Sequence, residues 1–299
     1  MRQTGLSARR EDTMALRPNP TLRQRRVGAE LRRMREEAGL GGSQLARQLG
    51  IHAAQITQME SGKSGISIDR LRTIAAACKC ENRPLINALS DITTSHEKGW
   101  WEQYRNRLPD TLIVSAEHED FAAGTIKSWI SPLIPGPLQT KDYARGIFNR
   151  RIPCLPDDEL ELRIAFRSER RDRILQNPHR SHEVYLHESS LLTRFGGTET
   201  LRDQLRSLID DSHRDDVRIH VIPFTADTYP GPIENLVYSL GVVPELDTVE
   251  VETSAGPMFF DALNELESYR KIFDRIGQVA LSEEDSRDLI HRTAKNLKG

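Results

Sequence analysis

Residues 43–60, SQLARQLGIHAAQITQME, decide the fold of the N-terminal third of the chain. Leu45 and Leu49 lie four residues apart on one face of a short helix, and Ile56 and Met59 mark the inner face of another. A glycine between the two runs is a natural helix stop. The pattern predicts two short helices joined by a tight turn, with the second helix projecting from a small bundle.

The flanking sequence continues the helical pattern. Val27, Leu31 and Met34 form one apolar stripe, and similar stripes follow the quoted stretch. Ser43 is the expected N-cap of the second helix. We expect an all-α domain over residues 23–91, with five short helices at about 23–38, 43–49, 53–60, 67–77 and 84–90.

Residues 1–22 differ from the domain that follows them. They carry arginines at positions 2, 9, 10 and 17 and show no apolar periodicity. We expect a flexible basic arm, which either adds contacts to a polyanion or has no role.

The third expected helix has the size and chemistry to enter the major groove of B-DNA, which is about 12 Å wide. Its outward side chains are short or carry an amide. A glutamine can bond an adenine edge through two hydrogen bonds, and an alanine methyl can pack on a thymine methyl. The outward face comprises His52, Ala53, Ala54, Gln55 and Gln58.

Charge is distributed unevenly along the chain. Residues 1–90 hold 16 basic and 8 acidic side chains, whereas the remainder holds 26 basic and 36 acidic ones. The net charge is therefore +8 before residue 91 and −10 after it, although the whole chain carries only −2. A basic N-terminal third indicates a polyanionic partner.

Composition excludes several classes of protein. The 299 residues are 37% hydrophobic and hold no apolar run that approaches the roughly 20 residues of a transmembrane helix. The N-terminus has no apolar core of a secretory signal. Cys78, Cys80 and Cys154 cannot form a disulfide framework. We expect a protein of the reducing cytoplasm, with no membrane partner.

After residue 91 helices and strands alternate irregularly. This order predicts a mixed α+β domain over residues 98–297, without a regular βαβ winding. Strands are expected over 125–134, 184–186, 217–223, 236–240 and 248–252. Helices are expected around Trp100–Tyr104 and over 112–123, 141–151, 157–175, 201–211, 262–276 and 282–297, with Thr140 and Ser282 as caps.

Residues 31–78, LRRMREEAGLGGSQLARQLGIHAAQITQMESGKSGISIDRLRTIAAAC, resemble the phage-repressor-like (Cro-type) helix-turn-helix family. The resemblance covers about residues 25–90. It implies an ion pair between Arg35 and Glu60 that locks the first helix to the third. The chain departs from the family at Gly41 and Gly42, where the family often has Thr-Gln, so the contact there is in question.

The resemblance also implies which residues meet DNA. Ala53, Ala54 and Gln58 match positions that read base edges. Ser43, His52, Gln55, Lys63 and Ser64 match positions near bound phosphates.

Four blocks in the second half resemble a domain of unknown function from actinobacterial antitoxin-like transcriptional regulators. They are LIPGPLQTKDYARGIF from residue 133, LHESSLLTRFGG from 186, DVRIHVIPF from 216 and ALSEEDSRDLI from 280. In such regulators this domain follows a Cro-type head. The resemblance implies that a small partner protein is encoded nearby.

Three clusters contain residue types that occur in catalytic or metal sites. His179, His182 and His187 lie on a loop and a strand, where they do not converge, and solvated histidines are expected. Cys78 and Cys80 lack a second pair for zinc. The run Glu117–Asp120 has no nucleophile motif beside it and predicts a surface helix face. We expect no catalytic residue, metal or cofactor.

The leading hypothesis is a sequence-specific transcriptional regulator that binds double-stranded DNA as a homodimer. The C-terminal domain would serve dimerisation, effector sensing or binding of a small partner protein. Two alternatives stay open: an antitoxin-like interaction module, and an enzyme domain in 98–297 targeted by the DNA-binding head.

Overall fold

The computed structural model describes residues 17, 19–94, 99–227 and 234–298. The chain divides into two compact units, residues 1–97 and 98–299. The expected arm, 1–22, lies largely outside the described residues. No helix in the described ranges is long and apolar enough to cross a membrane.

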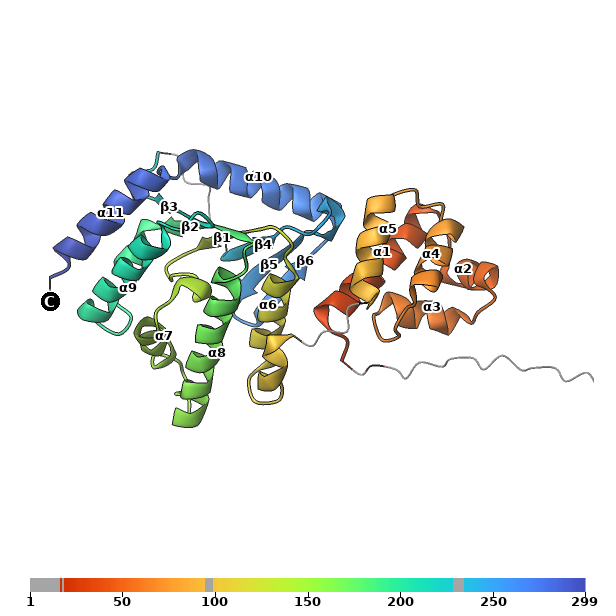
Figure 1. The fold of residues 1–299 in the computed structure, drawn as a ribbon, viewed down its shortest axis with the longest axis horizontal. Coiled ribbons are helices and arrows are strands. Elements are labelled where there is room, and N and C mark those ends of the chain that lie inside the picture. The colour runs from red at the N-terminus through yellow and green to blue at the C-terminus, as the bar shows by residue number, and fades with distance from the viewer. Residues whose placement is uncertain (1–16, 18, 95–98, 228–233, 299) are drawn as a thin grey trace, which may run out of the picture. The chain divides into compact units, whose positions relative to one another are not determined.

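The described part of the first unit is all helical (Figure 1). Leu31, Leu45, Ile56, Leu71 and Leu89 are almost fully buried and supply the core, one from each helix. The helices are α1 (Leu22–Glu37), α2 (Gly42–Leu49), α3 (Ala53–Glu60), α4 (Ile68–Ala77) and α5 (Arg83–Thr94).

The starts of α1, α2, α4 and α5 each differ from expectation by one residue, and the caps of α1 and α2 explain the first two. Helix α1 begins at Leu22 because Thr21 caps it: its hydroxyl accepts from Gln24 N at 3.3 Å, and Gln24 Oε1 accepts from Thr21 N at 3.0 Å. The prediction of Ser43 as the N-cap of α2 is wrong. Gly41 holds that position, since its N–H donates to Gln44 Oε1 at 2.7 Å and Ser43 already lies inside the helix.

The second unit is built on a six-stranded mixed sheet of order β3-β2-β1-β4-β5-β6. Strands β1, β2 and β3 run parallel, and the other neighbouring pairs are antiparallel. The α+β class is therefore confirmed. The strands are β1 (Thr125–Ile130), β2 (Ser181–His187), β3 (Val217–Ile222), β4 (Leu236–Ser239), β5 (Thr248–Thr253) and β6 (Gly256–Phe260).

Six α-helices and four short 3-10 helices surround this sheet in the described residues. The α-helices are α6 (Asp110–Phe121), α7 (Lys141–Phe148), α8 (Asp157–Leu175), α9 (Thr198–Asp211), α10 (Leu263–Val279) and α11 (Glu283–Asn296). The 3-10 helices are η1 (Trp100–Tyr104), η2 (Gly136–Leu138), η3 (Glu188–Leu191) and η4 (Pro244–Leu246). Thr140 and Ser282 cap α7 and α11, as expected.

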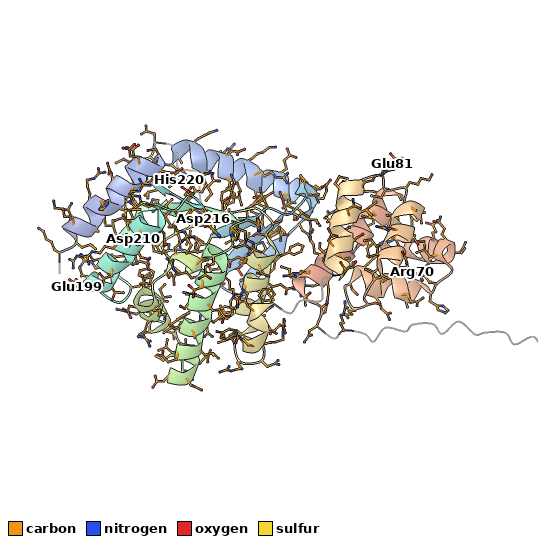
Figure 2. All side chains as sticks on the ribbon, in the orientation of Figure 1. Arg70, Glu81, Glu199, Asp210, Asp216 and His220 are labelled. Carbon is orange, nitrogen blue, oxygen red and sulfur yellow. The ribbon has the colours of Figure 1, made fainter. Side chains whose placement is uncertain are left out.

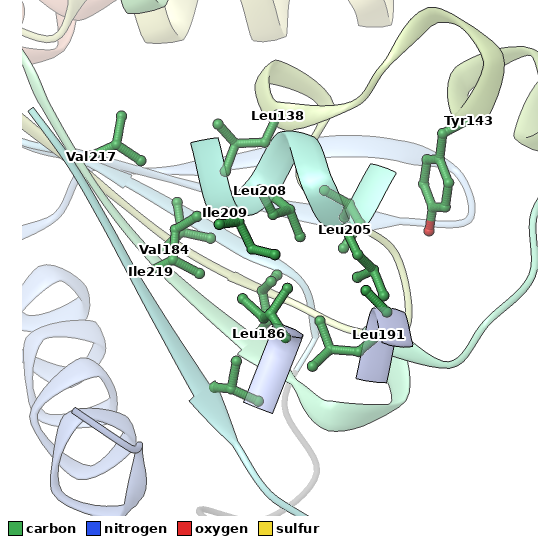
Figure 3. Packing of buried hydrophobic residues seen from close by; sticks show 14 of the residues in the cluster. Leu138, Tyr143, Val184, Leu186, Leu191, Leu205, Leu208, Ile209, Val217 and Ile219 are labelled. Atoms are coloured by element: carbon green, nitrogen blue, oxygen red, sulfur yellow. The ribbon is translucent and has the colours of Figure 1, made fainter. Parts of the chain in front are cut away.

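The two faces of the sheet carry separate cores. On one face, leucines of α9 pack against Val184 and Leu186 of β2 and Ile219 of β3 (Figure 3). On the other face, Phe273 and Ile276 of α10 join a second cluster that includes inward residues of β1, β4 and β5. Figure 1 shows α10 along one side of the sheet and α6, α8 and α9 on the opposite side.

Two strand expectations need correction. The strand expected over 125–134 ends at Ile130, because Pro132 and Pro135 have no N–H to give to a neighbouring strand. Strand β6 was not expected at all. It begins with Gly256 and Pro257, which disfavour strands, and it lies at the edge of the sheet where such residues are tolerated.

Candidate nucleic-acid interface

The turn between α2 and α3 depends on one glycine. Gly50 takes the left-handed conformation, with φ of +65°, which ends α2 and reverses the chain. Ile51 N then donates to Ala46 O at 3.0 Å, so the turn is tied back to the helix it leaves. Three residues later α3 begins, and the two helices form a tight pair.

Helix α3 buries one face and exposes the other. Ile56 and Met59 are buried in the bundle, whereas Ala53 and Ala54 at the start of the helix are exposed. Gln58 is half-buried and follows them on the outer side. The predicted base-edge residues therefore share the solvent-facing side of α3.

Sequence reasoning missed Thr57 on this outer face. Thr57 is exposed, and its hydroxyl donates to Ala53 O at 3.4 Å. Helical spacing would have found it, because Thr57 lies four residues after Ala53 and three after Ala54. A hydroxyl that is held on the backbone still has lone pairs for a donor on DNA.

Glutamines complete both helix starts. Gln44 Oε1 accepts from Gly41 N, as described above, and Gln55 Oε1 accepts from His52 N at 3.1 Å. Each side-chain amide NH₂ keeps its donors at the positive end of a helix, a place that favours phosphate. Ser43, His52 and Gln55 are all exposed there.

The loop after α3 presents a lysine. Lys63 has an exposed side chain, and its carbonyl accepts from Arg17 N at 2.8 Å. Ser64 is half-buried, and its N–H donates to Gln58 O at 3.0 Å. Gly62, with φ of +73°, makes this turn possible, because a Cβ there would lie 2.8 Å from the Gln24 backbone. The backbone of the loop is thus fastened to α3 and to Arg17, and the Lys63 side chain projects into solvent.

Arg35 and Glu60 form a two-armed ion pair between α1 and α3. Arg35 Nε and Nη2 donate to the two carboxylate oxygens at 2.6 and 2.9 Å, and Nη1 donates to Leu40 O at 2.9 Å. Both side chains are nearly buried, 12% and 13% exposed. The hydrogen bonds to Glu60 raise the pKa of Arg35, although burial acts in the opposite sense.

This pair also removes a charge that would oppose DNA. Glu60 is the single acidic residue of α3, and Arg35 neutralises it. The exposed side of α3 is left with methyl, amide and hydroxyl groups. Such a surface suits base edges and does not repel phosphates.

Two expectations about chemical clusters in the second unit are wrong. Glu117, His118 and Glu119 do not form a surface face, since all three are at most 3% exposed. Helix α6 lies on the sheet, so that His118 Nδ1 meets Glu250 Oε2 of β5 at 3.0 Å. Among the three histidines expected to be solvated, His182 is buried on β2.

The described residues show no group of three or more metal-ligating side chains that could hold an ion. Cys78 is buried, Cys80 half-buried and Cys154 exposed, all as free thiols. Trp101 and Tyr104 pack in a small core with Phe166 of α8, which assigns this aromatic run a structural role.

The geometry of the first unit defines a helix-turn-helix protein, with α3 in the place of the recognition helix. The model of a helix-turn-helix domain matches residues 26–89, which indicates DNA binding. The model described as a domain of unknown function, DUF5753, matches residues 115–292, more than half of the chain. The chain therefore belongs to the DUF5753 family. Comparison with curated proteins and with solved structures found no match.

Proposed function

We propose that the protein is a sequence-specific DNA-binding transcriptional regulator that inserts α3 into the major groove. The observation that carries this proposal is the outer face of α3, which has no free carboxylate and exposes Ala53, Ala54 and Thr57. The net charge of +8 over residues 1–90 adds the attraction for the phosphate backbone.

Within this proposal, residues divide into two roles. Ala53, Ala54 and Gln58 contact base edges, with Thr57 added from its position on the same face. Ser43, His52, Gln55, Lys63 and Ser64 hold phosphates on either side of the groove. With two alanines at the reading positions, part of the specificity comes from thymine methyls and DNA shape.

The proposal includes the wider organisation that the sequence resemblances imply. The protein acts in the cytoplasm as a homodimer, with Cro-type docking on half-sites about one helical turn apart. It has no catalytic activity. The acidic second unit contributes dimerisation, effector sensing or capture of a small partner protein, as in actinobacterial antitoxin-like regulators.

The test begins with duplexes selected from random sequence by the full-length protein, followed by fluorescence anisotropy. Gln58→Ala should lose about 1–3 kcal/mol of discrimination at particular base pairs, because an amide that reads a base edge is removed. Asn87→Ala is the matched control, since Asn87 is an exposed amide on α5. It should leave discrimination unchanged.

Lys63→Ala should weaken binding to all sequences alike and lower the slope of log K against log salt by about one. Arg83→Ala, which removes an exposed cation at the start of α5, is the control for charge. Selection of no sequence at low ionic strength, or variants of Gln58 and Lys63 that bind like the wild type, would contradict the docking of α3.

A further inference from the structure

The second unit contains a cavity of about 320 Å³ between its sheet and three of its helices. Its floor comes from one face of β1, β2, β4 and β5, where the strand register places Ser128, His182, Val237 and Glu250 on the same side. Its walls come from α6, α7, α8 and the segment 133–139. This volume falls at the lower end of the range that holds small-molecule ligands.

Much of the cavity lining is apolar. Ile126 and Ile130 of β1, Val184 of β2 and Leu112 of α6 all contribute, together with Ile134 before η2. Against this apolar background, α8 presents three arginines at positions 163, 167 and 170, which share one face of the helix. A cavity that combines apolar walls with a few placed charges is typical of a site for an amphipathic molecule.

Two of these arginines already have carboxylate partners. Arg163 Nη2 lies 2.6 Å from Glu159 Oε1. Arg170 forms a two-armed pair with Glu119, in which Nε donates to Oε2 and Nη2 to Oε1. Their charges are therefore balanced within the protein.

Arg167 differs from both neighbours. Its Nη1 donates to Gln139 Oε1, and its guanidinium lies 4.5 Å from the centre of the Phe148 ring. No ion pair joins it to a carboxylate in the described parts of the chain. Burial, with a smaller contribution from the nearby charge of Arg170, lowers the pKa of Arg167 to about 9. The cavity thus holds a guanidinium that makes no direct ion pair.

None of the acidic groups of the cavity forms a direct ion pair with Arg167, although the charges of Glu252 and Glu119 act on it from a distance. Glu250 accepts from the Ser115 hydroxyl at 2.6 Å and faces His118 at 3.0 Å. Burial would raise its pKa, but these two hydrogen bonds and the charge of Arg170 lower it. Glu252 is exposed and accepts from Asn235 Nδ2 at 3.3 Å.

A second polar group in the cavity, on its floor, lacks a hydrogen-bond partner. His182, 5% exposed, lines the floor, and its Nε2 has no hydrogen-bond partner among the described residues. A buried polar atom without a partner costs free energy, so its presence beside a cavity indicates a missing ligand. Arg167 and His182 come from different elements and independently point to one.

We propose that this cavity binds one small organic carboxylate, whose head group pairs with Arg167 and whose apolar body lies against the isoleucines of β1. A carboxylate is favoured over a phosphate because one guanidinium without an ion-pair partner matches a single negative charge, and its planar fork matches a planar head group. Binding of the carboxylate in the cavity does not require DNA. The role of this ligand as an effector of DNA binding rests on the function proposed above.

The experiment uses the full-length protein and a panel of hexanoate, octanoate, benzoate and 3-phenylpropionate, with the corresponding amines and inorganic phosphate as charge controls. At least one carboxylate should raise the melting temperature and bind one molecule per chain in calorimetry. The amines and phosphate should not. Absence of saturable binding by every carboxylate, or binding of phosphate alone, overturns the proposal.

Variants locate the site. Arg167→Met should weaken carboxylate binding by about tenfold or more, because the charged hydrogen bonds are lost while the volume is kept. Arg173→Met is the matched control, since Arg173 lies exposed on the same helix. Val237→Phe, which fills the cavity without a change of charge, should abolish binding even if Arg167→Met fails to fold. Binding that survives in both cavity variants overturns the assignment.

A final arm separates this proposal from the DNA-binding one. The anisotropy titration is repeated with and without saturating carboxylate. If the protein binds a carboxylate but no duplex, the ligand site is supported and the proposed DNA-binding function is contradicted. If it binds DNA sequence-specifically but no carboxylate, the DNA-binding function is supported and the ligand site is contradicted.

Discussion

At the scale of single residues, Arg35 connects α1 to α3. Its three hydrogen bonds reach Glu60 on α3 and the Leu40 carbonyl after α1. A two-armed pair that is nearly buried fixes orientation as well as distance. The angle at which α3 leaves the bundle therefore depends on this guanidinium.

Arg35→Met should destabilise the first unit by about 2–3 kcal/mol, because Glu60 is then left nearly buried without its partner. Glu60→Gln should cost less, since the amide oxygen still accepts one of the bonds. Native-state hydrogen exchange of amides in α1 and α3 measures this. Equal protection in wild type and Arg35→Met would show that the pair contributes nothing.

His182 leads to a second prediction at the scale of a residue, which concerns the stability of the protein at acidic pH. Burial lowers its pKa to about 4 from 6.5, so the unfolded chain takes up a proton at a pH where the folded chain does not. Stability is unaffected by this group above about pH 6.5 and falls by about 3 kcal/mol as the pH drops from 6.5 to 4.

Replacing His182 by Leu or by Asn should remove this part of the pH dependence. Urea unfolding at intervals between pH 7 and pH 4 measures it. Both variants should give a flatter curve than the wild type, and a curve as steep as the wild type's would exclude His182 as the source.

At the scale of elements, the close crossing of α1 and α3 requires a glycine. A Cβ on Gly28 would lie 2.4 Å from the Glu60 carbonyl oxygen and 2.8 Å from that of Met59. These are backbone atoms that cannot turn aside, so the two helices would have to move apart.

Gly28→Ala should therefore destabilise the first unit by at least about 1–3 kcal/mol, despite the better helix propensity of alanine. Gly42→Ala is the matched control, because nothing lies within 4 Å of a Cβ at that site in α2. It should stabilise the protein by about 0.5–1 kcal/mol. Thermal unfolding of both variants checks the opposite signs.

Elements with strong periodicity were predictable, and elements defined by partners far along the chain were not. The stripes of α1 to α5 gave the bundle, since each helix needs only its own apolar face. Strand β6 owes its existence to β5, because Gly256 and Pro257 have no strand preference of their own. The burial of Glu117, His118 and Glu119 likewise depends on β5, which brings Glu250 opposite α6.

The candidate sites divide in the same way. The outer residues of α3, including the overlooked Thr57, follow from helical phase. The cavity beside Arg167 does not, because its lining comes from α6, α7, α8 and four strands that are distant in sequence. Arg163, Arg167 and Arg170 have different partners. The sequence does not show this, because Glu159, Gln139 and Glu119 reach the arginines only in the folded chain.

At the scale of the whole molecule, the two units differ in charge and in construction. Charged side chains cover both, among them Arg70 and Glu81 on the helical unit and Glu199 and Asp210 on α9 of the sheet-based unit (Figure 2). Each unit carries its own buried core. Because each unit has its own core, we expect each unit to fold independently of the other.

Residues 98–299 expressed alone should unfold in one cooperative transition and retain carboxylate binding with the affinity of the full chain, because every residue lining the cavity lies within them. Circular dichroism during heating and calorimetry measure the two properties. A fragment that binds hydrophobic dye and melts without a transition would mean that the sheet-based unit needs the helical one.

The hydrogen bond from the Arg17 N–H to the Lys63 carbonyl has a practical consequence for handling the protein. It anchors the chain just ahead of α1 beside the loop that follows α3. A purification tag or fluorescent protein fused directly before Arg17 would start beside the Lys63 loop and, under the proposed docking of α3, would crowd an incoming duplex.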